Sequence, residues 1–297
     1  MNTKNILIVA LGLLTATACN RIDFNPGLIT VDARICPDTK AGSATDASKF
    51  EAGDELSVYA WTGDKSAIPS TLVVDGVKNT QGSDGKWTPE TMKRWADTVS
   101  DHYFVAVSPA RKVKDFKADA FTLDPADYAA SDLLIATNLT GLKSKDNPVS
   151  LNFDHVLAKL QVNLNFRNQW SGTPKVSAVT ATAAKTGTVD YLSKTLTAGA
   201  EKTGVSIPAL TAAAEGFALS FCGLMIPQYD FNTLELTVEG DNYVFTNTVD
   251  MPLVAGKITV LNLIIGRDVI ELSSEITIND WTSQGDAIDG DVFKPAA

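Results

Sequence analysis

The residues of this chain that could do acid–base, nucleophilic or metal chemistry are few and scattered. There are two histidines, His102 and His155, and each follows an aspartate and precedes a strand-like run. A single histidine at the start of a strand is typical of a structural residue rather than of a general base. The sequence has no Gly-x-Ser-x-Gly elbow, phosphate loop or dinucleotide fingerprint, and no cysteine or histidine pair at metal-ligand spacing. It therefore predicts a protein that is not an enzyme and that needs no metal or cofactor.

Carboxylates are the one catalytic residue type present in number. Their count alone leaves a glycosidase-like pair open, since such enzymes need only two of them. However, most of the acidic residues alternate with apolar residues, as the solvent-facing positions of a strand do.

One cysteine stands where a covalent modification is expected. Met1–Asn5 carries one positive charge, Ile6–Leu14 is almost entirely apolar, and the small residues Ala16–Ala18 lead directly to Cys19. This pattern indicates a secretory signal, and its apolar run is too short to span a membrane. It resembles a bacterial lipoprotein signal, in which Cys19 is lipidated and becomes the new N-terminus. Several acyl chains there would anchor the protein firmly to the outer membrane; the alternative is an ordinary signal peptide with a chance cysteine.

Composition limits the remaining possibilities. Hydrophobic residues make up 44% and charged residues 20% of the 297 residues, which favours packed cores over disorder. The net charge of −10 argues against nucleic acid as a partner, because an acidic surface repels phosphates. Cys36 and Cys222 could form a disulfide outside the cytoplasm. No local pattern sets the geometry for one, so two buried small residues are the simpler interpretation.

The hydrophobic pattern predicts strands along most of the chain. Alternation of apolar and polar residues predicts half-buried antiparallel strands, and continuous apolar runs predict central strands. Helical signals are short, and Gly- and Asn-rich turns such as Asp75–Gly76 separate the runs, which favours β-sandwiches. The alternating segments are Leu160–Arg167, Thr233–Glu239 and Ile276–Asn279; the continuous ones are Tyr103–Val107, Phe217–Ile226 and Ile258–Ile265; the short helical candidates are Pro89–Val99, Leu210–Glu215 and a capped start at Asp124–Asp127.

A polar stretch, Leu142–Pro148, is the expected domain boundary because its composition suits an exposed connection. It precedes the most strongly alternating strand of the chain. We expect a signal peptide at residues 1–18, a tether at 19–27, an N-terminal β-sandwich at 28–150 and a C-terminal β-sandwich at 151–297.

Seven segments in order resemble one protein family. Leu151–Val162 resembles the Phe-x-His-x-Leu-Ala-Lys-Leu-x-Val signature of the fimbrillins of Bacteroidales, which are type V pilus subunits and accessory proteins exported as lipoproteins. The resemblance implies two tandem transthyretin-like antiparallel β-sandwich domains and a place in a fimbrium on the cell surface. The six weaker matches are Phe50–Ala60, Tyr103–Pro109, Asp132–Ala136, Leu224–Gln228, Leu253–Lys257 and Ile276–Trp281.

The resemblance also implies a mechanism of assembly by donor-strand exchange. A surface protease removes an N-terminal strand, here Gly27–Ile35, with Leu28, Ala33 and Ile35 among the residues that would fill the groove. A strand of a neighbouring fimbrial subunit then takes its place by β-augmentation. The expected cut follows Lys40, or Arg34 as the alternative, and a subunit that is never cut would be an anchor or a tip.

The donor strand would lie in residues 286–297, where Ile288 and Val292 fall on one face. Simple fraying of this tail is the alternative.

Four tryptophans support a second hypothesis, a surface lipoprotein or tip adhesin that binds host or dietary glycans or proteins. They lie in or near turn-rich stretches, where an exposed indole can stack on a sugar ring, although core packing is the commoner fate of tryptophan. They are Trp61, Trp87, Trp95 and Trp170.

Overall fold

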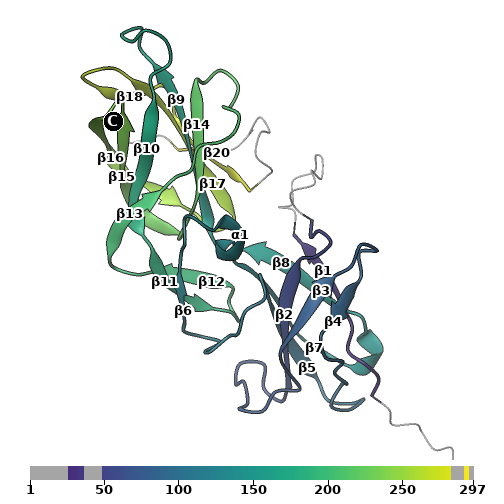
Figure 1. Ribbon diagram of the computed structural model, residues 1–297. Coiled ribbons are helices and arrows are strands. Elements are labelled where there is room, and N and C mark those ends of the chain that lie inside the picture. The colour runs from purple at the N-terminus through teal and green to yellow at the C-terminus, as the bar shows by residue number, and fades with distance from the viewer. Residues whose placement is uncertain (1–25, 37–48, 282–290, 294–297) are drawn as a thin grey trace, which may run out of the picture.

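The structure is a computed structural model, and it describes residues 26–36, 49–281 and 291–293 (Figure 1). Almost all of the regular structure in this part of the chain is β-strand, which confirms the all-β prediction. One turn of α-helix, α1 (Tyr128–Ser131), and one 3-10 turn, η2 (Ser144–Asp146), are the helical elements of the described residues. Two lobes with a small sheet between them form an elongated molecule (Figure 1).

The first lobe is built on a seven-stranded sheet with the order β1-β8-β7-β5-β2-β3-β4. Both faces of its middle strands are covered, because alternate residues of β2 and β5 belong to two different cores. The continuous apolar run Tyr103–Val107 therefore lies centrally, as predicted. The strands are β1 (Val31–Ile35), β2 (Glu55–Thr62), β3 (Val74–Gln81), β4 (Trp87–Pro89), β5 (His102–Ser108), β7 (Leu134–Leu142) and β8 (Val149–His155).

The second lobe is a sandwich of a four-stranded sheet, β13-β10-β15-β16, and a six-stranded sheet whose main path is β14-β9-β17-β19-β20. Apolar residues of both sheets share one core. Most neighbouring strands are antiparallel, but β9 and β17 run parallel, as β1 and β8 do. The strands are β9 (Ala158–Phe166), β10 (Val176–Ala184), β13 (Lys202–Ser206), β14 (Leu219–Met225), β15 (Gln228–Val238), β16 (Asp241–Leu253), β17 (Lys257–Ile265), β18 (Ile270–Leu272, paired with β17), β19 (Ile276–Asp280) and β20 (Asp291–Phe293).

Alternation along β9 explains how this sandwich is built. Leu160, Val162 and Leu164 face the core and are fully buried. On the opposite face Asn163 is also buried, and its side chain accepts a hydrogen bond from Ser220 Oγ at 2.7 Å and donates one to Asn262 Oδ1 at 2.9 Å. These bonds satisfy a buried amide that would otherwise cost stability.

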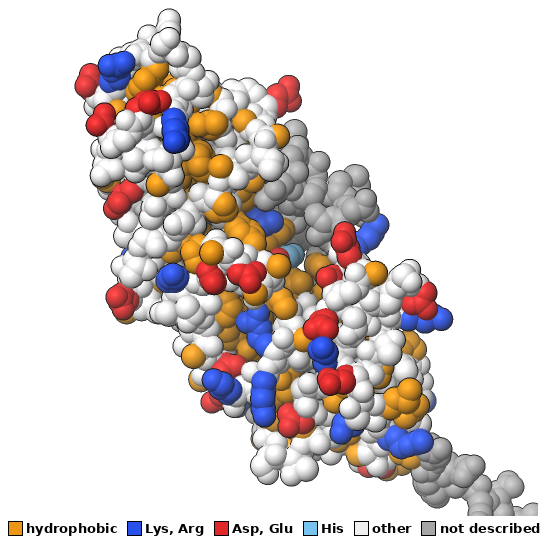
Figure 2. Space-filling model, in the orientation of Figure 1, with side chains coloured by type: hydrophobic (Ala, Val, Ile, Leu, Met, Phe, Trp, Pro, Cys, Tyr) orange, Lys and Arg blue, Asp and Glu red, His pale blue; other side chains and the backbone are white. Residues whose placement is uncertain are grey.

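A third sheet connects the lobes. It has the order β12-β11-β6 and consists of β6 (Asp119–Thr122), β11 (Thr186–Asp190) and β12 (Thr195–Ala198). The expected boundary near residue 150 falls within β8, and the chain passes from β8 to β9 through Val156 and Leu157, which are both buried. Because β6 precedes β8 in the chain yet pairs with β11, this small sheet combines strands from both halves of the chain. Hydrophobic side chains reach the surface around this middle part of the molecule, and charges of both signs lie among them and over the lobes (Figure 2).

Two helix predictions are wrong. Pro89–Val99 forms the end of β4 followed by bends, and Leu210–Glu215 is a loop whose Leu210 N–H donates to Ser220 O of β14. Backbone hydrogen bonds to residues 27–29 in the first case, and to β14 in the second, take the place of the internal bonds of a helix. The capped start is real but later than expected: Asp127 accepts from Ala130 N at 3.0 Å and caps α1.

The pair Asp75–Gly76 is not a turn but a bulge inside β3. The register between β2 and β3 shifts between Val58 and Ala60, opposite this pair, and Gly76 has φ +62°. Bulges use positive φ as turns do, so the local sequence signal is the same. A Cβ at Gly76 would lie 2.9 Å from the Tyr59 hydroxyl oxygen, which leaves room only for glycine.

Candidate functional site

The first candidate site is the contact between residues 27–36 and β8, which we call the seam. Here β1 runs parallel to β8 at the edge of the seven-stranded sheet, with Val31 beside Val149 and Ile35 beside Phe153. Alternation directs one face of the segment inward, because Ala33 and Ile35 are both 8% exposed whereas Asp32 is exposed.

Side chains fasten the seam at both ends. At the start of β1, Thr30 N donates to Asn147 Oδ1 at 2.9 Å and Asn147 Nδ2 donates to Thr30 Oγ1 at 2.8 Å. Near the other end, Arg34 Nε donates to Asn152 Oδ1 at 2.7 Å. The side-chain amides of Asn147 and Asn152 therefore fix the register of β1. No sequence pattern distinguishes these two asparagines from other exposed asparagines.

The same segment also reaches the opposite end of the sheet. Ile29 N donates to Lys93 O at 2.8 Å and Trp95 N donates to Gly27 O at 3.3 Å, just beyond β4. Leu28 forms an isolated antiparallel bridge with Arg94. Residues 27–35 thus contact β8 at one edge of the curled sheet and the chain just beyond β4 at the other edge. In this way they close the sheet.

The core beneath the seam is strongly apolar. Val149, Leu151 and Phe153 are fully buried, and Phe153 packs edge-to-face against Phe50 with ring centroids 5.2 Å apart. Without β1, the edge of β8 would expose unpaired backbone groups beside this apolar surface. Such an edge binds any extended chain that can supply hydrogen bonds and apolar side chains.

The structure places the predicted groove-filling residues only in part. Ala33 and Ile35 fill the core, but Leu28 is 39% exposed and its place is taken by Ile29 at 7%. The reason is geometric: side chains an odd number of positions apart lie on opposite faces of a strand. Arg34 is exposed on the outer face of β1.

Other predicted site residues lie at or beyond the limits of the described part. Cys19, Lys40 and Ile288 lie outside the described residues. Val292 belongs to β20, which pairs antiparallel with β19 so that Val292 is opposite Thr277. In this chain residues 291–293 therefore add to the six-stranded sheet of the second lobe.

Three of the four tryptophans expected to bind glycans are buried, which corrects that expectation. Trp61, Trp95 and Trp87 are 0%, 2% and 8% exposed, and Trp61 Nε1 donates to Asp64 O at 2.9 Å. Their turn-rich surroundings gave no sign that the indoles point inward. Trp170 is only partly buried and lines a surface pocket.

The second candidate site is a junction cluster of Asp132, His155, Lys159 and Trp281. The His155 ring stacks on the Trp281 ring at 4.0 Å, and His155 Nδ1 lies 3.0 Å from Asp132 Oδ1. Lys159 Nζ also lies over the Trp281 ring, 4.2 Å from the ring centroid. The side-chain partner of His155 is therefore a carboxylate. These residues come from three segments far apart in the sequence, Asp132–Ala136, Leu151–Val162 and Ile276–Trp281, and no pattern predicts their contact.

Burial controls the ionisation of groups around this cluster. Burial lowers the pKa of the Lys159 ammonium, and burial raises the pKa of the nearby Cys222 thiol. Both directions favour the uncharged form. Cys222 is buried and Cys36 is exposed, and they are not paired with each other. The interpretation of the two cysteines as buried small residues is therefore correct for Cys222 but wrong for Cys36, whose side chain is exposed.

The described residues lack two other features of functional sites. No group of three or more His, Cys, Asp or Glu side chains among them is placed to hold a metal ion. No helix in the same ranges combines the length and apolarity needed to cross a membrane.

The model of the fimbrillin-like family matches residues 39–281. A candidate cell adhesion protein from Bacteroides uniformis has a similar structure, with a TM-score of 0.65 and 18% identity over 86% of this chain and 98% of that one. A second from Bacteroides ovatus gives 0.64 and 15% identity over 88% and 99%. A fimbrial protein from Bacteroides vulgatus gives 0.52 and 13% over 86% and 99%. At these identities the likeness concerns the fold. A comparison with curated proteins finds no match.

Proposed function

This chain belongs to the fimbrillin-like family, and we propose that it is a fimbrial subunit that assembles by strand exchange at the seam. The family consists of fimbrial proteins, so a place in a cell-surface fimbria follows from membership. The proposal adds the route: export as a lipoprotein, anchoring of Cys19 in the outer membrane, and a cut after Lys40. Residues 27–36 then leave, and the tail of a neighbouring subunit occupies the edge of β8.

The observation that carries the proposal is the way β1 is attached. Its strand partner β8 lies more than a hundred residues away in sequence, and only residues 37–48 connect it to the rest of the first lobe. A cut in that segment would leave non-covalent contacts alone to hold β1. Burial of each of Ile29 and Ile35 contributes about 1.5–3 kcal/mol. Much of that gain would be offset by the entropy of holding a separate peptide, so a cut strand can leave.

The side-chain pattern of β1 indicates what can replace it. On the inward face, Val31, Ala33 and Ile35 present a large, a small and a large residue at alternate positions. The tail repeats this order with Ile288, Gly290 and Val292. We therefore assign Ile288 to the position of Val31, Gly290 to that of Ala33 and Val292 to that of Ile35. Gly290 has no side chain to fill a pocket, but it suits the position of Ala33, where the residue on the inward face is small.

A disulfide across the seam tests this proposal. Asp32 and Ser150 are direct partners in the register, and neighbouring strands lie about 4.8 Å apart, within the range that a disulfide spans. The variant Asp32→Cys/Ser150→Cys, made with Cys36→Ser to remove the nearby exposed thiol, should therefore lock β1 in place when oxidised.

The measurement is uptake of a labelled peptide of residues 282–297 after limited trypsin treatment, followed by fluorescence anisotropy. The reduced variant should lose residues 27–36, as mass spectrometry would show, and bind the peptide; the oxidised variant should do neither. Equal binding to both forms would place the acceptor site elsewhere. A cut, reduced protein that keeps β1 and stays monomeric would refute strand exchange.

The position of the cut separates a shaft subunit from an anchor or tip. N-terminal sequencing of protein taken from the cell surface should find chains that begin just after Lys40, or after Arg34. If every molecule keeps an acylated Cys19, the subunit is not part of a polymerising shaft. A glycan-binding role is supported by a different feature, the pocket beside Trp170.

A further inference from the structure

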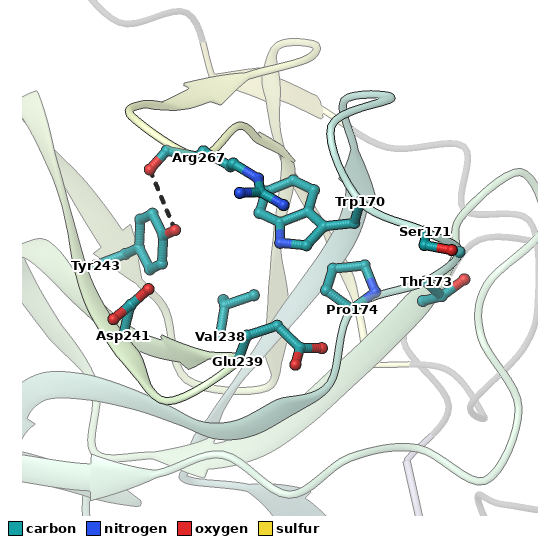
Figure 3. A pocket seen from close by; sticks show the side chains of 10 residues that line it. Trp170, Ser171, Thr173, Pro174, Val238, Glu239, Asp241, Tyr243 and Arg267 are labelled. Atoms are coloured by element: carbon teal, nitrogen blue, oxygen red, sulfur yellow. Dashed lines mark hydrogen bonds between the residues drawn. The ribbon is translucent and has the colours of Figure 1, made fainter.

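A pocket of about 430 Å³ lies at the end of the second lobe and is formed by three separate segments (Figure 3). The loop after β9 supplies one wall, the β15–β16 turn supplies the floor and one side, and the loop after β17 supplies the rest. In Figure 1 the loop after β9 is at the top of the molecule, while β4 and β5 of the first lobe are near its foot. The residues that matter for recognition are Trp170, Glu239, Asp241, Tyr243 and Arg267.

Hydrogen bonds between the three segments hold the pocket in shape. Arg267 N donates to Gln169 Oε1 at 2.7 Å, and Arg267 Nε donates to Gln169 O at 2.9 Å. Across the pocket, Lys175 N donates to Glu239 Oε1 and Glu239 N donates to Lys175 O at 2.9 Å. Glu239 adopts φ +54°, a conformation that its place in the tight turn requires. A pocket ordered in advance loses little entropy when a ligand binds.

Aromatic rings and polar groups face one another across this space. Figure 3 shows Trp170 on one side and Tyr243 on the other, with Asp241 and Glu239 below them. Tyr243 is fixed because its hydroxyl donates to Arg267 O at 3.2 Å. The Asp241 carboxylate makes no hydrogen bond or ion pair within the part of the chain that the structure describes, so it is available to accept bonds from a ligand.

We propose that this pocket binds a neutral saccharide. A pyranose ring has apolar C–H faces that pack on an indole and equatorial hydroxyls that donate to carboxylates, and this pocket offers both kinds of group. The terminal nitrogens of Arg267 complete the set as donors to sugar oxygens.

The charges of the pocket argue against other ligand classes. Two carboxylates, Asp241 and Glu239, outnumber one guanidinium, so an anionic ligand would be repelled. A cationic ligand at the face of Trp170 would lie beside the Arg267 guanidinium, whose carbon is 5.8 Å from that ring centroid, and the two like charges would repel each other. Saccharide binding does not depend on strand exchange, because the seam and the pocket lie in different lobes.

Titration of the full chain in detergent with neutral sugars tests the inference. Glucose, galactose, mannose and N-acetylglucosamine, each as the methyl glycoside, would be measured by isothermal titration calorimetry, with choline and N-acetylneuraminate as the cationic and anionic probes. At least one neutral glycoside should bind, and more tightly than either charged probe. Absence of binding by all four, or tighter binding of a charged probe, would overturn the assignment.

Variants locate the site. Trp170→Ala should weaken the binding of that glycoside at least tenfold, about 1.4 kcal/mol. Asp241→Asn should weaken it several-fold while the fold stays intact, because the exposed carboxylate has no partner within the described ranges to lose. The matched control is Tyr229→Ala, which removes a ring that is 73% exposed on β15 and outside the pocket, and it should bind as the wild type does. Unchanged affinity in both pocket variants would place the site elsewhere.

Discussion

The substitution Ile35→Ala should loosen β1 without unfolding the rest of the first lobe. Ile35 is 8% exposed and packs in the core beneath the seam. Truncation of a buried isoleucine to alanine costs about 2–5 kcal/mol, and an edge strand can relax, so we expect about 2 kcal/mol. Since about 1.4 kcal/mol corresponds to a tenfold change in an equilibrium constant, the population of molecules with β1 undocked should rise about 30-fold.

Hydrogen exchange at individual amides measures this opening. The reporters are amides that bond across the seam or beside it: Val149 N to Thr30 O, Cys36 N to Phe153 O and Ile29 N to Lys93 O, each at 2.8 Å. Their exchange should speed up about 30-fold, because local opening exposes them to water.

The control is Asp32→Ala on the exposed face of β1, which should leave the same rates unchanged. In the wild-type protein the seam amides should open at a lower free energy than amides in the central strand β5. If both sets open at the same free energy, opening is global and β1 is not an independent unit. If no amide responds, burial of Ile35 does not hold the strand.

Other substitutions test the packing around the lobes. Tyr59→Phe should lower the free energy of unfolding by about 1–3 kcal/mol in urea, because the hydroxyl oxygen accepts a hydrogen bond from the buried Val113 N at 2.8 Å; wild-type stability would contradict this role. Gly187→Ala should cost about 1–3 kcal/mol in the same assay, since its Cβ would lie 2.6 Å from a backbone oxygen of β12, and an unchanged midpoint would show that the small sheet yields. The Ser100 hydroxyl and nearby backbone amides lower the pKa of Asp97 to about 2 from 3.8. The stabilisation from this carboxylate is therefore complete above pH 4 or so and is lost as the pH falls through about 2. An NMR titration of Asp97 with a midpoint near its ordinary value would refute this, and Asp97→Asn should remove that part of the pH dependence.

Strands with clear periodicity could be predicted from the sequence. Leu160–Arg167 corresponds to β9 and Ile258–Ile265 to β17, because burial on one face or on both leaves a direct trace in the order of apolar residues. The continuous run at Tyr103–Val107 likewise identifies a strand covered on both faces. Such patterns report the environment of a strand and not the identity of its neighbours.

Pairings between distant segments could not be read in the same way. The contact of β1 with β8, and that of β6 with β11, join residues far apart in sequence, and many edges would satisfy the same alternation. Leu28 was expected inside, but regular alternation back from Ile35 and Ala33 places Ile29 on the inward face and Leu28 on the outer one. The direction of an isolated indole is similarly invisible, as buried Trp61 and partly exposed Trp170 both lie near turns.

The parallel course of β1 and β8 determines how the first lobe responds to mechanical load. The chain before Val31 leaves at the end of the pair where β8 begins, and the chain after His155 leaves at the other end. Tension between the N-terminal side and the second lobe therefore pulls the two strands past each other along their length. All ladder bonds then bear the strain together, whereas a hairpin pulled at its free ends opens one bond at a time. The first lobe therefore resists tension applied between Val31 and the second lobe through all of these bonds at once.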